Sequence, residues 1–591
     1  MIKTLKLSDI IKNQAVLNVG CIGHVSNGKS TLVRQMTGIK TQKFKSEKER
    51  NCTINVGYGN CKIFYNEESD EYKFTGSDKM DETDSKGNKM DLIHHISFVD
   101  CPGHENYMSN MLCGASVIDM AFLVEAANAE IVPQPQTLEH FIAIQHTEVD
   151  DIVVIQNKCD LVKREHILTN KSQIEDFIDD IIDSELPIIP LIAQSGDNIE
   201  YVGQYLSNKL VNYKKDINLP LQMNIIRTFD VNKPNIALDN LIGGVLGGSI
   251  AQGMLKNDEI IQISPGICSE NKDGSWKVEP LFTRVKSINS EKNSMDYAIP
   301  GGLIGVGTTI DPAYTKGNKL TGQIITNPGK NLPITSNITV KYSSFRRVGK
   351  ISKTLSNNEV VKVGIISNHV SATVINWDKK KKLIQLQLAM PTCINDSSVS
   401  IMKKMDKSFK IFSVGKIVEH TPIDIEIPPE YISSDTCKYE ISNDISKNNE
   451  LTCFDYDTML DKLSNKFVKK VKLKLPNPII TKTKNGRQQI VNNFGNIVSI
   501  IQNEKDEQNF ITIFEKEIAN QLSCSVNQNE KKSLLIHGKV KNTAINNSIM
   551  KSLCKIRKCS TCKGFNTFLK KTDRNLTMSC IECKSESIIT N

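Results

Sequence analysis

Gly23–Ser30 reads GHVSNGKS and fits the pattern G-x-x-x-x-G-K-[ST]. It lies between an apolar run at residues 16–22, which predicts a strand, and an amphipathic run starting near Lys29, which predicts a helix. A phosphate-binding loop requires this order: its glycines let backbone N–H groups turn toward phosphates, Lys29 neutralises charge, and the Ser30 hydroxyl coordinates Mg²⁺. The stretch therefore predicts a nucleoside triphosphate site.

Two later segments indicate that the nucleotide carries guanine. Asp100–Gly103, DCPG, follows apolar residues 95–99, where the aspartate can hold the metal and the glycine N–H can reach the γ-phosphate. Asn157–Asp160, NKCD, follows a second apolar run at residues 151–156. Asp160 can accept hydrogen bonds from both N1–H and the 2-amino group of guanine, which adenine cannot offer, so we expect GTP to be selected over ATP.

Composition places the chain among soluble multidomain proteins. It has 591 residues, a formal charge of +8 and an apolar fraction of 39%, and no run predicts a signal peptide or a membrane span. Its 16 cysteines mostly occur singly in apolar segments, which argues against a disulfide framework and for a reducing cytosol. We therefore expect a cytoplasmic protein, in a host cytoplasm if the source is a virus or an intracellular parasite.

The pattern along the chain predicts a multidomain protein of α/β and all-β parts. Strand-like and helical stretches alternate first, as in a doubly wound, mostly parallel sheet, and short β-branched runs with Gly and Pro turns then predict two β-barrels. The expected parts are an N-terminal arm (1–14), a GTP-binding domain (15–212), two barrels (219–325 and 330–420), a linker (421–450), a helix (451–470), a small α/β domain (471–553) and a zinc ribbon (554–591).

Four cysteines near the end of the chain have the spacing of a closed zinc site. Cys559 and Cys562 form one C-x-x-C pair, and Cys580 and Cys583 form the other. Four thiolates fill a tetrahedral shell and leave no position for water, so we expect a structural zinc ion. Because the ribbon would have no core of its own, we expect it to unfold without zinc. Redox chemistry at these cysteines is the weaker alternative.

Four segments resemble the gamma subunit of eukaryotic and archaeal translation initiation factor 2. They are Lys48–Ile54 (KERNCTI), Val99–His104 (VDCPGH), Pro133–Thr137 (PQPQT) and Phe229–Pro234 (FDVNKP). The similarity runs over about residues 17–418 and implies a translation initiation GTPase.

The tail resembles a different polypeptide, the beta subunit of the same factor. Phe454–Leu463, FDYDTMLDKL, is similar to the beta-subunit helix that packs on the gamma GTP-binding domain, and Asn493, Phe494 and the cysteine ribbon continue the likeness. The chain is therefore interpreted as a gamma–beta fusion. A flexible linker would keep the tail at high local concentration near its docking surface.

The gamma resemblance assigns roles within the site. Thr53 matches the switch threonine that meets Mg²⁺ and the γ-phosphate in the GTP state, and His104 matches the residue that positions the attacking water. Magnesium would be held through Ser30, Thr53 and Asp100. No arginine finger is evident in the motifs, so we expect slow, partner-stimulated hydrolysis. The residues predicted to bind the nucleotide are Ser26, Asn27, Gly28, Lys29, Ser30, Thr31, Asp100, Gly103, Asn157, Lys158, Asp160, Ala193 and Gln194.

The partners that the resemblance implies begin with initiator methionyl-tRNA, bound in the GTP state, delivered to the small ribosomal subunit and released after hydrolysis. An alpha subunit, initiation factor 5 and the exchange factor are further candidates. The long lysine-block extension of eukaryotic beta subunits is missing, which weakens the last two. Candidates for tRNA contact, by charge alone, are Arg346, Arg347, Lys469, Lys470, Lys472 and Lys474.

Three departures from the family pattern stand out. Asn27 replaces the usual histidine of the loop, which should leave the phosphate cradle intact. Ile192-Ala193-Gln194 replaces Ser-Ala-x, so the Ala193 N–H can still reach guanine O6 but the serine hydroxyl is lost. The insert at residues 66–90 has no cysteine knuckle, so no second metal site is expected.

Two other functions stay open. The chain could occupy tRNA or the ribosome without productive hydrolysis, as a decoy or regulator. Alternatively, the tail could be similar to the amino-terminal zinc domain of initiation factor 5 and activate hydrolysis in cis, which would need an arginine that reaches the γ-phosphate.

Overall fold

The computed structural model describes residues 2–41, 47, 53, 56–104, 107–145, 149, 151–182, 185–209, 215–232, 241–330, 332–343, 354–395, 398–405, 408–431, 438–442, 444–445, 455–464, 476–483, 488–503, 506, 510–529, 532–538, 540–559, 565–572, 575–581 and 585–589. The chain forms two compact units, Met1–Asn465 and Lys466–Asn591.

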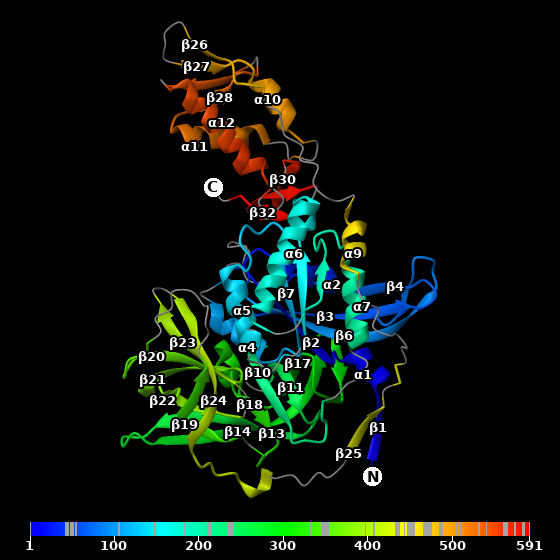
Figure 1. Ribbon diagram of the computed structural model, residues 1–591, viewed down its shortest axis with the longest axis vertical. Helices are drawn as coiled ribbons and strands as arrows, with labels where there is room; N and C mark the ends of the chain where they lie inside the picture. Colours follow the sequence, from blue (N-terminus) through cyan, green and yellow to red (C-terminus); the bar gives the residue numbers. More distant parts are fainter. Residues whose placement is uncertain are drawn as a thin grey trace. The chain divides into compact units, whose positions relative to one another are not determined.

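A mostly parallel sheet forms the centre of the domain predicted to bind GTP, called the G domain below (Figure 1). Its strands lie in the order β4 (Glu71–Gly76), β3 (Gly57–Asn66), β6 (Lys89–Asp100), β2 (Leu17–Ile22), β7 (Met120–Ala126), β8 (Asp151–Asn157) and β9 (Ile188–Pro190). From β6 to β9 neighbouring strands are parallel, whereas β3 and β4 add an antiparallel edge, and β5 (Glu82–Thr83) pairs with β6. This confirms the predicted doubly wound class and places the insert in an extension of the sheet.

Helices cover both faces of this sheet. They are α2 (Lys29–Thr37) and α7 (Ile199–Lys209) on one face and α4 (Met108–Ala115), α5 (Pro135–Gln145) and α6 (Arg164–Asp179) on the other. Alternate residues of β7 enter the two cores: Phe122 joins the first and Leu123 the second. A strand buried on both faces reads as a continuous apolar run, which is why β7 has no polar alternation.

Two β-barrels follow. The first is a ring in the order β13 (Ile260–Glu270), β18 (Ile324–Thr326), β10 (Gln222–Phe229), β11 (Val245–Gln252), β17 (Ile304–Thr308) and β14 (Trp276–Ser290), closed by the β13–β14 pairing, with β15 (Asn293–Met295) on β14. The second is a closed barrel of β19 (Ile334–Ser343), β22 (Leu383–Cys393), β21 (Asn368–Asp378), β20 (Val360–Ile365), β23 (Val399–Met405) and β24 (Ser408–Pro422). The short pair β12 (Leu255–Lys256) and β16 (Tyr297–Ala298) and the helix α8 (Pro312–Thr315) accompany the first barrel.

The barrels pack on the G domain through apolar side chains. Met402 and Ile411 of the second barrel belong to the core under α4 and α5. Ile226 of the first barrel clusters with Cys113 and Val117, at and just after α4. The Arg227 guanidinium adds a hydrogen bond to the carbonyl of Val56, three residues after Thr53, the predicted switch threonine. The barrels therefore meet the region of the G domain that the nucleotide is expected to control.

The predicted N-terminal arm and the predicted linker are joined by backbone hydrogen bonds. β1 (Ile2–Lys6) pairs in parallel with β25 (Lys438–Ser442), and α1 (Leu7–Asn13) buries Leu7, Ile10 and Ile11 beside them (Figure 1). Asn218 and Tyr439 exchange two hydrogen bonds of 2.9 and 2.8 Å through the Asn218 side chain. The expectation of a flexible linker is therefore wrong for this part, because the strand pairs its polar backbone groups.

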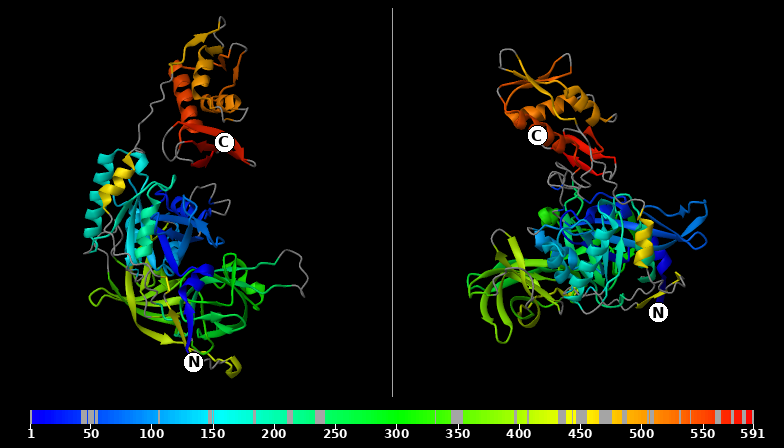
Figure 2. Two further views of the ribbon diagram at one scale, coloured as in Figure 1. Left: turned by 90° about the vertical axis from the view of Figure 1, so that its right-hand side faces the viewer. Right: turned by 45° about the horizontal axis from the view of Figure 1, so that its top comes forward.

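The tail helix docks on the G domain. α9 (Tyr456–Lys462) falls within the predicted helix, residues 451–470, of which the structure describes 455–464. It lies along the helices of the G domain, as Figure 2 shows in yellow. Asp455 caps it by accepting from the N–H groups of Asp457 and Thr458. Met459 belongs to the core between the sheet and α7, and Leu460 is fully buried. This contact agrees with the beta-subunit resemblance.

The described residues of the second unit form a four-stranded sheet, three helices and a three-stranded ribbon. The sheet runs β26 (Ile480–Lys482), β27 (Gln488–Val491), β29 (Leu534–His537) and β28 (Val526–Gln528); the helices are α10 (Phe494–Ile501), α11 (Phe510–Leu522) and α12 (Asn542–Arg557); the ribbon is β30 (Thr567–Thr572), β31 (Asn575–Cys580) and β32 (Glu586–Ile588). Leu569 and Met578 of the ribbon pack in one core with the helices. The ribbon thus shares a core across the predicted boundary at residue 553, and α12 crosses that boundary. Within the described residues, no helix combines the length and the apolar character needed to cross a bilayer.

Candidate functional site

The loop between β2 and α2 has the geometry of an anion cradle. Ser26 and Gly28 both have left-handed backbone, with φ of +66° and +102°, and alternation of handedness turns successive N–H groups toward one point. A Cβ on Gly28 would lie 2.2 Å from Asn157 Nδ2, so only glycine fits. Lys29 Nζ donates to the carbonyls of Gly23 (2.8 Å) and His24 (2.7 Å), and burial lowers its pKa. A phosphate group fits this buried cation and these donors.

Oxygen atoms gather beside Lys29. Ser30 Oγ lies 3.0 Å from Thr53 Oγ1, and Thr53 Oγ1 lies 3.4 Å from Asp100 Oδ2. Thr41, which the sequence reasoning did not single out, donates to the same Asp100 oxygen at 2.6 Å. Burial raises the pKa of Asp100, against the opposing effect of these hydroxyls and of Lys29. A buried carboxylate with two hydroxyls is a donor set that suits Mg²⁺, which would stabilise the charged form.

The DCPG segment brings backbone close to the cradle. A Cβ on Gly103 would lie 2.4 Å from Lys29 Nζ and 3.0 Å from the Gly23 carbonyl oxygen. His104, the predicted water-positioning residue, is half-buried, and its ring centroid lies 5.7 Å from that of Tyr107. Any side chain at position 103 would fill the space beside Lys29, so this position leaves room for a phosphate group if it is glycine. His104 is the next residue in the chain.

Hydrogen bonds join the segments predicted to select guanine to the loop predicted to hold phosphate. Asn157 Nδ2 donates to the Asn27 carbonyl at 2.8 Å, while its Oδ1 accepts from Lys158 N at 2.8 Å and Ala193 N at 3.0 Å. The Ala193 N–H, predicted to reach guanine O6, thus has a protein acceptor. Burial raises the pKa of Asp160. Thr31 and Gln194, also predicted to contact nucleotide, lie half-buried at the start of α2 and just after Ala193.

Three side chains behind the loop were not assigned from sequence. His140 Nδ1 accepts from Gly23 N at 3.1 Å, and Thr137 Oγ1 accepts from His24 N at 3.1 Å. The third is Glu125, a buried carboxyl at the end of β7. The only sequence signal for Thr137 is the family likeness of the PQPQT segment that contains it. The support that α5 gives to the loop after β2 is seen from the hydrogen bonds of Thr137 and His140 to that loop.

The tail helix α9 forms hydrogen bonds with residues that flank the segments predicted to hold guanine. The Tyr456 hydroxyl donates to Gln156 Oε1, next to Asn157 in the chain. Asn198 Nδ2 donates to the Met459 carbonyl at 2.7 Å and the Pro190 carbonyl at 2.9 Å. α9 therefore contacts residues that lie next to the two segments expected to hold guanine, Gln156 before Asn157 and Asn198 a few residues after Gln194.

Two of the four predicted zinc ligands lie together. Cys559, just after α12, and Cys580, at the end of β31, are both buried and in contact. Cys562 and Cys583 lie outside the described residues. Among the described residues alone, no group of three or more His, Cys, Asp or Glu side chains could hold a metal ion. Two thiols from separate C-x-x-C pairs at one point fit a zinc ion.

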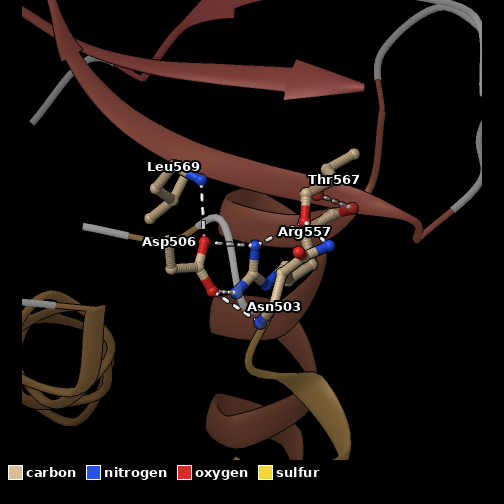
Figure 3. Close-up of polar contacts among 5 residues, drawn as sticks. All are labelled: Asn503, Asp506, Arg557, Thr567 and Leu569. Atoms are coloured by element: carbon tan, nitrogen blue, oxygen red, sulfur yellow. Dashed lines mark hydrogen bonds and ion pairs between the residues drawn. The ribbon is translucent and has the colours of Figure 1, made fainter. Parts of the chain in front are cut away.

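A buried arginine joins the ribbon to the rest of the tail. Arg557, 1% exposed, forms an ion pair with Asp506 and donates to the Thr567 carbonyl at 2.6 Å (Figure 3). Asp506 Oδ1 also accepts from Leu569 N at 2.8 Å. These contacts fix β30 on α12. The side chains proposed for tRNA contact, Arg346, Arg347, Lys469, Lys470, Lys472 and Lys474, lie outside the described residues.

Three family models match the chain. "Elongation factor Tu GTP binding domain" covers residues 14–216, and "Initiation factor eIF2 gamma, C terminal" covers residues 336–417. A domain found in initiation factors 2B and 5 covers residues 463–586. The first two follow the G domain and the second barrel, and the third covers nearly all of the second unit.

Curated relatives match along the gamma-like part. The chain is 38% identical to eukaryotic translation initiation factor 2 subunit gamma of Schizosaccharomyces pombe, over 69% of this chain and 95% of that protein. It is 37% identical to eukaryotic translation initiation factor 2 subunit 3 of Drosophila melanogaster, over 69% of this chain and 90% of that protein.

Solved structures share the fold at low identity. A bacterial selenocysteine-specific elongation factor matches with a TM-score of 0.52 and 18% identity, covering 68% of this chain and 58% of that one. Elongation factor SelB from Methanococcus maripaludis, in complex with a GTP analogue, matches with a TM-score of 0.51 and 19% identity, covering 70% of this chain and 80% of that one.

Proposed function

Because this chain belongs to the gamma-subunit family of eukaryotic translation initiation factor 2 and is a translational GTPase, we propose that it carries initiator methionyl-tRNA in its GTP state. It delivers that tRNA to the small ribosomal subunit and releases it after hydrolysis. The observation that carries the proposal is the match over 95% of a gamma subunit by a chain whose phosphate loop, Thr53 and Asp100 lie together.

Hydrolysis is assigned to the residues around Lys29. Lys29 and the loop N–H groups hold the β- and γ-phosphates, and Ser30, Thr53 and Asp100 hold Mg²⁺. When bound, that ion neutralises charge that develops on the phosphate oxygens. His104 positions the attacking water. His104→Ala should lower the single-turnover hydrolysis rate by about 10²-fold or more while GTP affinity stays within about twofold; equal rates would remove His104 from the mechanism.

Thr53 is assigned the switch between states. Its hydroxyl lies within reach of Ser30 and Asp100, and nearby Val56 accepts a hydrogen bond from Arg227 of the first barrel. A γ-phosphate that orders Thr53 would therefore bias a segment in contact with a barrel. This connection supports a tRNA-binding surface that depends on GTP.

The tail is assigned the place of a beta subunit. Its match to the domain of initiation factors 2B and 5, the docking of α9 on the G domain and the contact between Cys559 and Cys580 support a covalently attached, zinc-holding beta-like region. Zinc would be held by Cys559, Cys562, Cys580 and Cys583. An alpha subunit, initiation factor 5 and the exchange factor are candidate partners, and the cytoplasm is the expected location.

A cis-activating tail is the second candidate function, because the matched domain is named for initiation factor 5 as well as for initiation factor 2B. The described arginine of the tail, Arg557, cannot serve as an arginine finger while it is buried against Asp506. Arg487 and Arg574 lie outside the described residues. Loss of single-turnover hydrolysis in Arg487→Ala or Arg574→Ala, with GTP binding intact, would favour this function.

Binding of labelled initiator methionyl-tRNA to the full chain tests the carrier proposal. Tight binding is expected with a non-hydrolysable GTP analogue and weak binding with GDP, and elongator methionyl-tRNA is the control. Binding that ignores the nucleotide, in the presence and absence of an added alpha subunit, would refute the carrier and favour the decoy.

A further inference from the structure

A carboxyl group is buried behind the phosphate loop where an apolar strand would need none. β7 is otherwise uncharged and fully buried, yet its last residue but one is Glu125, which is 1% exposed. Burial of a charged or polar group costs free energy unless hydrogen bonds satisfy it. None of the nucleotide motifs includes Glu125, so nucleotide contact does not explain why a carboxyl group is buried at this position.

Glu125 links two positions of the phosphate loop to the elements behind them. Its Oε2 accepts from Asn27 Nδ2 at 3.1 Å and from Thr137 Oγ1 at 2.9 Å. Thr137 Oγ1 in turn accepts from His24 N at 3.1 Å. Asn27 Nδ2 is also held by the Val124 carbonyl at 2.9 Å. One oxygen atom thus fixes an amide side chain of the loop directly and a loop backbone N–H through one hydroxyl.

We infer that Glu125 is a positioning residue for the phosphate loop, and that loss of its proton weakens guanine nucleotide binding. The inference rests on the proposed role of this loop as the phosphate site and deepens it. It also explains Asn27, which stands where the family has histidine: an amide can donate to the Val124 carbonyl and to the carboxyl at once.

The charge on Glu125 is set by its surroundings. Burial raises its pKa to about 7, while the Thr137 hydroxyl, the Lys29 ammonium, the Gln134 backbone and the Asn27 amide act in the opposite direction. Two histidines also face the loop. Burial lowers the pKa of His140 to about 3, and burial lowers that of His24, so both favour the neutral form near pH 7. The carboxyl therefore changes charge close to neutrality.

The direction of the pH effect follows from charge. A bound polyphosphate repels the carboxylate, so it raises the pKa of Glu125 above its value in the free protein. By linkage, the protonated protein binds nucleotide more tightly, by a factor equal to the ratio of the acid dissociation constants of Glu125 in the free and bound protein. Affinity should be highest below the pKa of the free protein, fall as pH rises through about 7, and level off above the pKa of the complex.

Two substitutions separate the hydrogen bonds from the charge. Glu125→Gln keeps an acceptor oxygen for Asn27 and Thr137 but cannot ionise. Glu125→Met has similar volume and no acceptor, so Thr137 loses the partner for its hydroxyl. Thr137→Val leaves residue 125 itself unchanged. It removes the hydroxyl that links Glu125 to His24 N, so the carboxyl has one hydrogen-bond donor fewer.

The experiment measures the Kd of a fluorescent GDP analogue for the full-length chain from pH 6 to 8.5. The ratio of the native Kd to the Glu125→Gln Kd cancels titration of the nucleotide and of His24. We expect this ratio to rise at least threefold across pH 7. The Glu125→Met and Thr137→Val variants should bind the GDP analogue about 5- to 100-fold more weakly than the native chain does at every pH, as expected when a buried donor loses its acceptor. Thermal unfolding of each variant checks that it folds.

A constant ratio, with native binding intact, would overturn the role of the charge. Native affinity in folded Glu125→Met or Thr137→Val would overturn the positioning role. A native chain that binds no guanine nucleotide at any pH would instead overturn the proposed function, and the inference with it.

Discussion

Met459→Ala should detach the tail helix from the G domain without unfolding that domain. Met459 of α9 is 1% exposed and belongs to the apolar core that also contains Ile199 and Val202 of α7. Its neighbours Leu460 and Leu463 are 0% and 1% exposed. These three apolar side chains are the fully buried ones of the tail helix, whereas its ion pairs with Arg164 and Glu200 lie at its exposed edge.

The magnitude follows from the burial of Met459. Truncation of a buried methionine to alanine costs about 2–5 kcal/mol in a core. α9 is a short helix at the surface of the G domain that can undock by local opening. The lost free energy therefore weakens the docking of α9 and does not lower the stability of the whole domain. A loss of about 2–3 kcal/mol lowers the docking equilibrium constant by roughly 30- to 150-fold.

Hydrogen–deuterium exchange of the α9 amides measures this equilibrium. Met459→Ala should speed exchange of residues 456–462 by that factor, while amides of β2 and β7 keep their protection. Lys462→Ala is the matched control: its ion pair with Glu200 is exposed, with side chains 56% and 36% accessible, so it should cost less than about 1 kcal/mol. Equal exchange in the two variants, or loss of protection in β2 with none in α9, would refute the reasoning.

Three further perturbations test the site and the tail. Gly103→Ala would place a Cβ 2.4 Å from Lys29 Nζ, so GTP affinity should fall at least about tenfold, roughly 1.4 kcal/mol; a titration with unchanged Kd would contradict the fit. Asp506→Ala would leave Arg557 buried without its partner, at a cost of about 3–5 kcal/mol, and should lower the thermal midpoint of the tail; a loss under about 1 kcal/mol would contradict it. Chelation of zinc should make the Cys559 thiol reactive to alkylation while circular dichroism of the tail changes little, because the ribbon shares the core of the helices; full loss of the tail signal would restore the view of an independent ribbon.

Local patterns were sufficient for the fold class and the nucleotide motifs. Strand, glycine-rich turn and helix are contiguous around Gly23–Ser30, so short-range geometry fixes the cradle. The same holds for the alternation that predicts the sheet and for the short strands that predict the barrels. The linker was misjudged because β25 is stabilised by β1, more than 430 residues earlier in the chain, and its own composition carries no sign of that pairing.

The family, the GTPase motifs, the two barrels and the spacing of the cysteine pairs were all predictable from the sequence, because each depends on residues close together in the chain. Three sets of contacts became visible from the folded chain alone: Thr41 donates to Asp100, Glu125 and Thr137 hydrogen-bond with the loop of residues 23–30, and Tyr456 donates to Gln156, just before Asn157. These contacts join residues that lie far apart in the chain and depend on how buried faces pack. Hydrophobic burial selects that packing for the molecule as a whole, so no single segment encodes it.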